Sequence, residues 1–130
     1  MKTTSSKVGV ILVFLMALIQ GFYAIFSYVD PMAFAVVRGT ELFSSMDSDW
    51  VKIYGSRTLF ITLILGYLLY VRNYTVLMWC ALFGVVMPIT DGILAYEAGA
   101  PFTVVIKHVA TMVFLLVAFF VLRAAVREKE

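Results

Sequence analysis

The chain has 130 residues, of which 63% are hydrophobic and 14% charged, with ten lysines and arginines against eight aspartates and glutamates. An ordinary soluble domain is roughly 45–50% apolar, so this composition excludes a soluble globular domain, a disordered tail and a nucleic-acid-binding protein. A membrane-spanning helix needs about 20 mostly apolar residues to cross about 30 Å of hydrocarbon. Four such spans account for most of the chain, and the sequence therefore predicts an all-α integral membrane four-helix bundle with short loops, forming one domain over residues 1–130.

The first predicted span covers residues 8–29, a run without any charged residue. Lys2 and Lys7 precede it, as they would precede a signal peptide, but the apolar stretch is long and lacks a small residue three positions before a cleavage point. We therefore expect an uncleaved signal-anchor span. Pro31 ends it, because proline cannot donate a backbone hydrogen bond, and residues 32–43 are then expected to form an interfacial half-helix, since their apolar part is too short to cross.

The second predicted span covers residues 51–71. Its charge-free run begins only at Thr58 and is too short to cross alone, so the helix must include Arg57. Trp50 and Tyr54 suit the aromatic belt at a membrane interface.

The third predicted span covers residues 75–97 and contains two features that are unusual in a membrane helix, Pro88 and Asp91. Because proline has no N–H, Pro88 leaves the carbonyl of Gly84 without its helical partner. Such breaks occur in membrane helices where a cavity or another polar group satisfies the carbonyl.

The fourth predicted span covers residues 102–122 and carries Lys107 and His108 in its first half. With four spans, both termini lie on the same side of the membrane. Six basic residues fall on that side, so the positive-inside rule places both termini in the cytoplasm, for a multi-pass protein of a bacterial inner (plasma) membrane. These residues are Lys2, Lys7, Arg72, Arg123, Arg127 and Lys129.

With this topology, all four spans bring polar residues to a similar depth in the outer half of the bundle, which predicts a polar pocket there. An embedded charge is costly and usually faces inward and pairs, so we expect an ion pair between Arg57 and Asp91. Asp91 and His108 are the candidate catalytic residues, because a carboxylate and an imidazole can exchange protons. The candidate ligand-binding residues are Gln20, Tyr54, Arg57, Asp91, Lys107, His108 and Thr111.

Each of these residues also has a structural interpretation. In this interpretation the Arg57–Asp91 pair fixes the register of the bundle and has no further role. His108 likewise makes a structural hydrogen bond and takes no part in chemistry. Lys107 could extend its ammonium toward the interface, and Gln20 could join two helices. With one histidine and no Cys/His cluster, the sequence predicts no metal site and no pair of axial haem ligands, and it identifies no cofactor.

Short motifs along the chain resemble a known family. They are Pro31 with Ala33-Phe34 after it, Tyr54-Gly-Ser-Arg57, Pro88-Ile-Thr-Asp91-Gly, Gly99-Ala-Pro and Lys107-His108-Val-Ala-Thr111. Together they resemble small four-helix membrane proteins, mostly bacterial, that are grouped as a domain of unknown function and are broadly DoxX-like in shape. Lys107 in front of His108 departs from that pattern. The resemblance covers residues 20–122 and implies a four-helix bundle with a polar pocket, but no activity.

Three functions are consistent with this pattern. The first is a pocket, opening from the outer leaflet, that binds or processes a small lipophilic molecule such as a quinone or an isoprenoid, with Arg57 holding an anionic or carbonyl oxygen. The second is an accessory subunit, part of a homo-oligomer or a larger membrane complex, in which the polar layer only holds the helices together. The third is a small proton-coupled transporter that uses Asp91, although its depth differs from the midplane site that alternating access favours.

Overall fold

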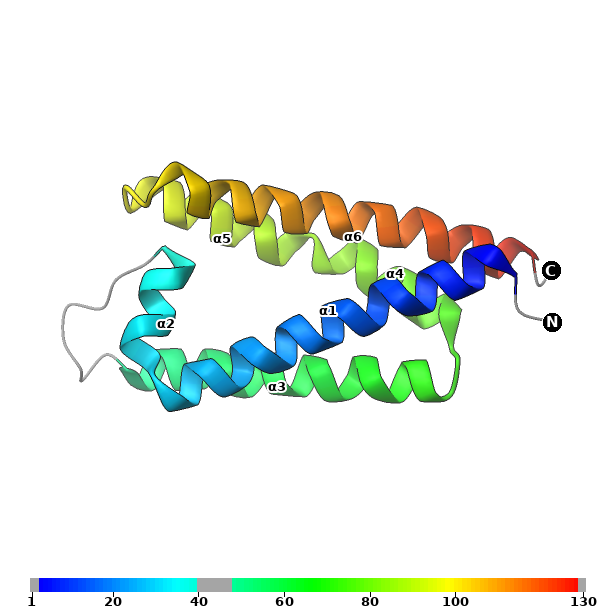
Figure 1. Ribbon diagram of the computed structural model, residues 1–130, viewed down its shortest axis with the longest axis horizontal. Coiled ribbons are helices and arrows are strands. Elements are labelled where there is room, and N and C mark those ends of the chain that lie inside the picture. The colour runs from blue at the N-terminus through cyan, green and yellow to red at the C-terminus, as the bar shows by residue number, and fades with distance from the viewer. Residues whose placement is uncertain (1–2, 40–47, 129–130) are drawn as a thin grey trace.

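The computed structural model describes residues 3–39 and 48–128, which form six helices in a four-span bundle (Figure 1). Four segments are long and apolar enough to cross a membrane: Thr4–Val29, Ser48–Tyr70, Tyr74–Glu97 and Phe102–Glu128. The prediction of an all-α, multi-pass membrane bundle is therefore confirmed. The helices are α1 (Thr4–Val29), α2 (Pro31–Arg38), α3 (Ser48–Tyr70), α4 (Tyr74–Gly84), α5 (Val86–Glu97) and α6 (Phe102–Glu128).

The helices begin where side chains can satisfy the free N–H groups of a first turn. Thr3 accepts a hydrogen bond from the Ser6 N–H at the start of α1, and Asn73 accepts one from the Val76 N–H at the start of α4. The last helix continues six residues beyond the expected end at 122, because residues 123–128 include good helix formers such as arginine and alanine that can extend the helix outside the hydrocarbon.

The short helix α2 spans residues 31–38, whereas the half-helix was expected over 32–43. Asp30 caps it by accepting a hydrogen bond from the Ala33 N–H, and Pro31 occupies its first turn. Gly39 ends it with φ 86°, a left-handed conformation that glycine adopts without steric cost. Residues 40–43 of the expected half-helix lie outside the described residues.

The third span is interrupted, so α4 and α5 are separate helices joined at Val85. The break falls one turn before Pro88, as expected for a proline that cannot bond the carbonyl of Gly84. Gly84 and Pro88 both line the main cavity of the bundle, so the irregular backbone is placed where a cavity can accommodate it.

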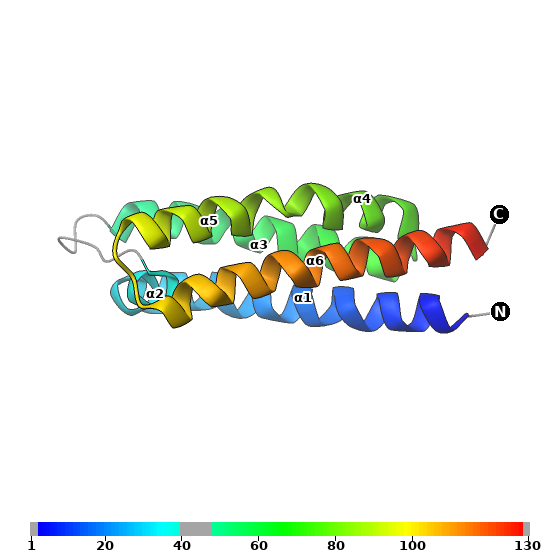
Figure 2. The same cartoon turned by 90° about the horizontal axis from the view of Figure 1, so that it is seen from above.

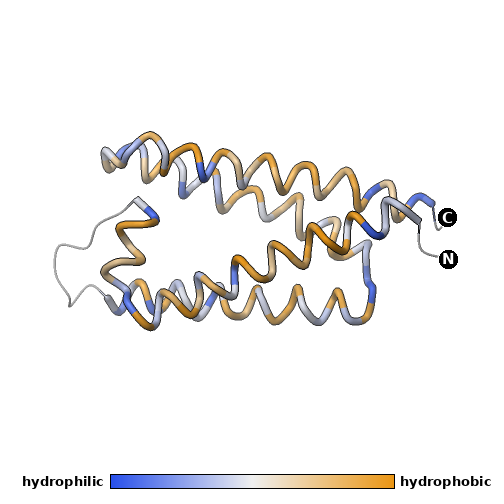
Figure 3. The backbone as a smooth tube through the Cα atoms, viewed as in Figure 1, coloured by the Kyte–Doolittle hydropathy of each residue, from blue (hydrophilic) through white to orange (hydrophobic). Residues whose placement is uncertain are grey.

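The four spans form two layers, one of α1 and α3 and the other of α4–α5 and α6 (Figures 1 and 2). Both termini and the α3–α4 turn lie at one end of the bundle, here called the terminal end, and α2 lies at the other, the α2 end. The layers meet at the terminal end, where Gly9 of α1 faces Leu122 of α6. They separate toward the α2 end, and α2 sits between them there. Hydrophilic positions lie toward both ends of the bundle, and the middle of the spans is mostly hydrophobic (Figure 3).

Candidate functional site

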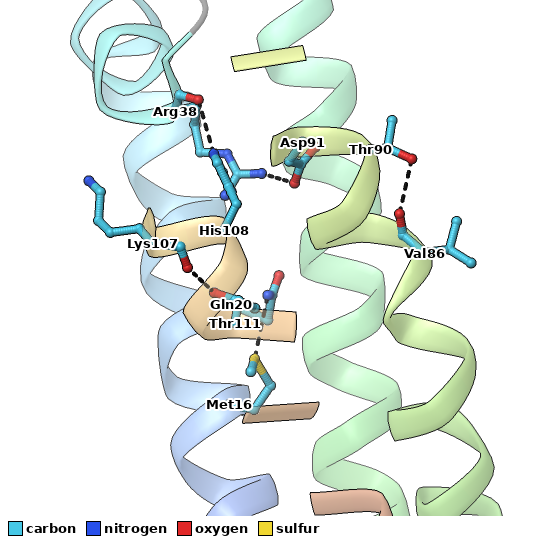
Figure 4. A network of polar contacts seen from close by, with 9 residues as sticks. All are labelled: Met16, Gln20, Arg38, Val86, Thr90, Asp91, Lys107, His108 and Thr111. Atoms are coloured by element: carbon cyan, nitrogen blue, oxygen red, sulfur yellow. Dashed lines mark hydrogen bonds and ion pairs between the residues drawn. The ribbon is translucent and has the colours of Figure 1, made fainter. Parts of the chain in front are cut away.

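The site is organised around Arg38, the last residue of α2. Its guanidinium donates to the carboxylate of Asp91 on α5 in an ion pair (Figure 4). The two side chains are 17% and 29% exposed. Asp91 lies six residues from the end of α5, about 9 Å along the helix axis, so the pair is within the membrane-spanning part of the bundle. An embedded carboxylate there needs such a partner.

The expected pair between Arg57 and Asp91 is wrong. Arg57 is exposed on α3, and its guanidinium donates to the Ile53 carbonyl of its own helix at 3.5 Å. It does not line the main cavity. The arginine partner of Asp91 comes from α2 because that helix folds back between the two layers and directs the Arg38 side chain into the bundle.

Two tyrosine rings also contact the Arg38 guanidinium. Its Cζ lies 5.7 Å from the ring centroid of Tyr23 on α1 and 5.4 Å from that of Tyr54 on α3. Cation–π contacts of this kind contribute about 0.5–2 kcal/mol each, more when water is excluded. Phe34 of α2 is buried against both rings, with centroid distances of 5.9 Å to Tyr23 and 5.6 Å to Tyr54. The aromatic cluster therefore fixes α2 and places its arginine.

His108 of α6 bonds the backbone of α2. Its Nε2 lies 3.3 Å from the Arg38 carbonyl oxygen, and because a carbonyl only accepts, the Nε2–H is the donor. The carbonyls of the last helical turn have no partner within the helix, so His108 supplies a hydrogen bond to a partly buried carbonyl at the end of α2. The imidazole is only 5% exposed. His108 thus makes a hydrogen bond between α6 and α2, the kind of contact that its structural interpretation expects.

Arg38 consequently contacts all four spans, through Tyr23 on α1, Tyr54 on α3, Asp91 on α5 and His108 on α6. Sequence reasoning missed Arg38 because this residue, nine positions after the end of the first span, was assigned to the membrane interface. A signal was available: a basic residue directly before glycine, closing a short proline-initiated helix, is typical of a helix C-terminus.

The other predicted ligand-binding residues are Gln20, Lys107 and Thr111, and all three line the main cavity. The Gln20 amide donates to the Met16 sulfur at 3.7 Å, and the Thr111 hydroxyl donates to the Lys107 carbonyl at 2.9 Å. Lys107 is exposed, and Figure 4 shows its ammonium directed away from Asp91. The structure thus brings six of the seven predicted residues to one cavity and leaves Arg57 outside it.

The cavity has a volume of about 780 Å³ and extends between the layers from the ion pair toward the terminal end. Volumes of about 300–1,000 Å³ are typical of ligand sites. Its walls are mostly apolar, and its polar groups are concentrated at the α2 end (Figure 4). A second cavity of about 240 Å³ lies between α2, α3 and α5 and shares Arg38, Tyr54 and Asp91 with the first.

The described residues offer no obvious metal site: within 3–39 and 48–128 there is no group of three His, Cys, Asp or Glu side chains that could hold an ion. Asp91 and His108 are each engaged by α2, through the side chain and the carbonyl of Arg38 respectively. The arrangement can supply hydrogen bonds and an apolar volume to a bound molecule.

These features define a polytopic α-helical membrane protein whose spans line a cavity that is closed at one end by an ion-paired, aromatic cluster. The sequence profile of a domain of unknown function (DUF4267) matches residues 8–122, and the chain belongs to that family. No curated protein and no solved structure gives a significant match to the chain.

Proposed function

We infer that this protein binds a small lipophilic molecule in the cavity between its two layers. The observation that carries the inference is the cavity itself, about 780 Å³ of mostly apolar volume with its polar groups gathered at one end. A ligand with an apolar body and a small polar head matches that distribution, because each part would lie against groups of its own kind.

Asp91 and His108 both hold α2 at the polar end of the cavity. Asp91 is ion-paired with Arg38, and the Nε2–H of His108 is donated to the Arg38 carbonyl. The role proposed for this cluster is to close the α2 end of the cavity and to hold its polar wall in place.

The membrane orientation proposed is the one with both termini in the cytoplasm, in the inner (plasma) membrane of a bacterium. The excess of lysine and arginine at the terminal end supports it. In this orientation the polar end of the cavity lies in the outer half of the membrane.

The test is the thermal stability of the purified protein in detergent with a quinone, an isoprenoid alcohol and a fatty alcohol. We expect at least one of them to raise the melting temperature of the wild type and of Arg57→Met, which changes an arginine outside the cavity. Arg38→Met should lose that rise. If Arg38→Met only lowers stability and no lipophile affects the wild type, the cluster is a structural lock and the accessory-subunit function is favoured.

A further inference from the structure

The cavity is open on one side of the bundle. Helix α1 packs against α3 and α6, and α6 packs against α4 and α5, but within the described parts of the chain α3 and α5 make no extended contact. Cavity-lining residues of α3 on one side of this gap, and of α4 and α5 on the other, are exposed at the surface. Phe60 of α3 is 64% exposed, and Phe83 and Val86 on the opposite side are each 66% exposed.

This opening lies at the depth of the acyl chains. Phe60 is twelve residues from the start of α3 at Ser48, and Val86 is eleven residues from the end of α5 at Glu97. At 1.5 Å per residue these separations are about 18 and 17 Å, near the middle of the hydrocarbon layer. A molecule passing between the two helices therefore comes from the bilayer and not from water.

The ion pair at the polar end of the cavity carries no uncompensated charge next to the apolar volume. Lys107 also lines the cavity, but it is exposed and its ammonium is directed away from the ion pair (Figure 4). The Arg38 guanidinium is neutralised by Asp91 and covered by Tyr23 and Tyr54. An anionic head would have to compete with Asp91 for that guanidinium, and a cationic head would have to compete with Arg38 for the carboxylate. Either would place an unpaired charge in a low-dielectric site, which is costly.

Gln20 is the polar side chain best placed to receive a head group. It is half-buried, lines the cavity, and its hydrogen bond to the Met16 sulfur at 3.7 Å is a weak one. Its amide can both donate and accept, as a hydroxyl or carbonyl head requires. Figure 4 shows Gln20 and Thr111 at one level, on the terminal side of the ion pair.

We propose that the ligand is an uncharged amphiphile dissolved in the bilayer, which reaches the cavity between α3 and α5 and places a hydroxyl or carbonyl head on the Gln20 amide. This rests on the proposed function and specifies the ligand's charge, its source and its route.

The experiment uses the full-length protein in phosphatidylcholine nanodiscs with a hexadecanol analogue that carries a photoactivatable diazirine in its tail. Cross-linked peptides are mapped by mass spectrometry, with unlabelled hexadecanol, hexadecanoic acid and hexadecyltrimethylammonium as competitors. We expect adducts on cavity-lining residues, and we expect hexadecanol to compete at an at least roughly tenfold lower concentration than either charged amphiphile. A charged amphiphile that competes equally well overturns the proposal, while a complete lack of cavity adducts in the wild type counts against ligand binding itself.

Two valines provide a matched test of the route. Val86→Trp narrows the opening between α3 and α5, whereas Val113→Trp makes the same change on α6, where the side chain is 50% exposed and does not line the cavity. We expect Val86→Trp to slow cavity labelling severalfold and Val113→Trp to leave its rate unchanged. Equal rates in the two variants overturn access by this route.

Gln20→Leu tests the head-group contact while keeping the side chain close in volume. We expect the concentration of hexadecanol needed for competition to rise about fivefold, the effect of losing one hydrogen bond. The labelling rate with the diazirine probe in excess should stay close to that of the wild type, which shows that the variant is folded. If hexadecanol competes equally well in Gln20→Leu and in the wild type, Gln20 does not contact the head group.

Discussion

The two ends of the bundle are held together by different interactions. At the terminal end, the layers meet through interdigitated apolar side chains, with Leu77 of α4 and Leu122 of α6 fully buried and Gly9 allowing α1 to approach closely. At the α2 end, the layers are joined through α2, by the contacts of Arg38 and by the aromatic cluster around Phe34. The cavity lies between these two regions.

This difference follows from the bilayer as a solvent. Lipid tails are as apolar as leucine, so helices in a membrane gain little from hydrophobic burial and associate through close packing and polar contacts. Where small residues allow close approach, packing suffices. Where the helices diverge, polar groups that lipid cannot satisfy must find partners in the protein, and α2 supplies them.

The largest effect is expected from Arg38→Met, which leaves the Asp91 carboxylate without its partner. Because both side chains keep some exposure, we expect a loss of about 3 kcal/mol in the free energy of unfolding, at the low end for breaking a buried pair. The matched control Arg57→Met should change it little. Unfolding in sodium dodecyl sulfate measures both, and an Arg38→Met/Asp91→Leu double variant should lose less than the two single variants combined. Equal losses for Arg38→Met and Arg57→Met would contradict the assignment of the pair.

At the terminal end, Leu122→Ala should remove packing without touching any polar contact. We expect a loss of about 2 kcal/mol, the lower end for a leucine truncation, because the core here gains little from burial as such. Leu63→Ala, the same change on an exposed face of α3, should be nearly neutral. Ligand-induced stabilisation should persist in Leu122→Ala, and its loss would mean that the two ends are not independent.

A smaller effect is expected where α2 ends. Gly39→Ala forces a left-handed alanine and brings its Cβ within 2.9–3.0 Å of Val104, Ala100 and Ala95. Gly99→Ala provides the matched control, because Gly99 also has a positive φ but no neighbouring atom within 4 Å of the added Cβ. We expect about 1.5 kcal/mol for Gly99→Ala from the backbone alone and a larger loss for Gly39→Ala. Similar losses in the two variants would show that the residues around Gly39, at the end of α2, are not tightly packed.

The smallest effect is expected from His108→Phe, which removes the donor to the Arg38 carbonyl and keeps an aromatic ring. We expect a loss of about 1 kcal/mol for one unpaired acceptor. Thr111→Val, which removes a hydroxyl bonded within its own helix, should lose less. A neutral His108→Phe would indicate that the carbonyl finds another donor.

Much of the fold could be predicted from residue types alone. The lengths of the apolar runs predicted four spans, Pro31 marked the end of the first span, and Pro88 indicated the break in the third span. Each of these follows from a local property of the chain: the hydrophobic length needed to cross a bilayer, or the missing N–H of proline. Six of the seven predicted ligand-binding residues line one cavity, because the helix register and the topology fixed their depth.

The tertiary structure alone decided which arginine meets Asp91. Arg38 precedes the second span, and Arg57 lies within its first turns. The expected depth of Arg57 in the membrane, close to that of Asp91, favoured Arg57 as the partner. The outcome depends on the rotation of α3, which turns Arg57 outward, and on the path of α2, which folds back between the layers. Both are set by contacts among residues far apart in the chain, such as Phe34 with Tyr23 and Tyr54, and such contacts have no counterpart in the spacing of residues along a single helix.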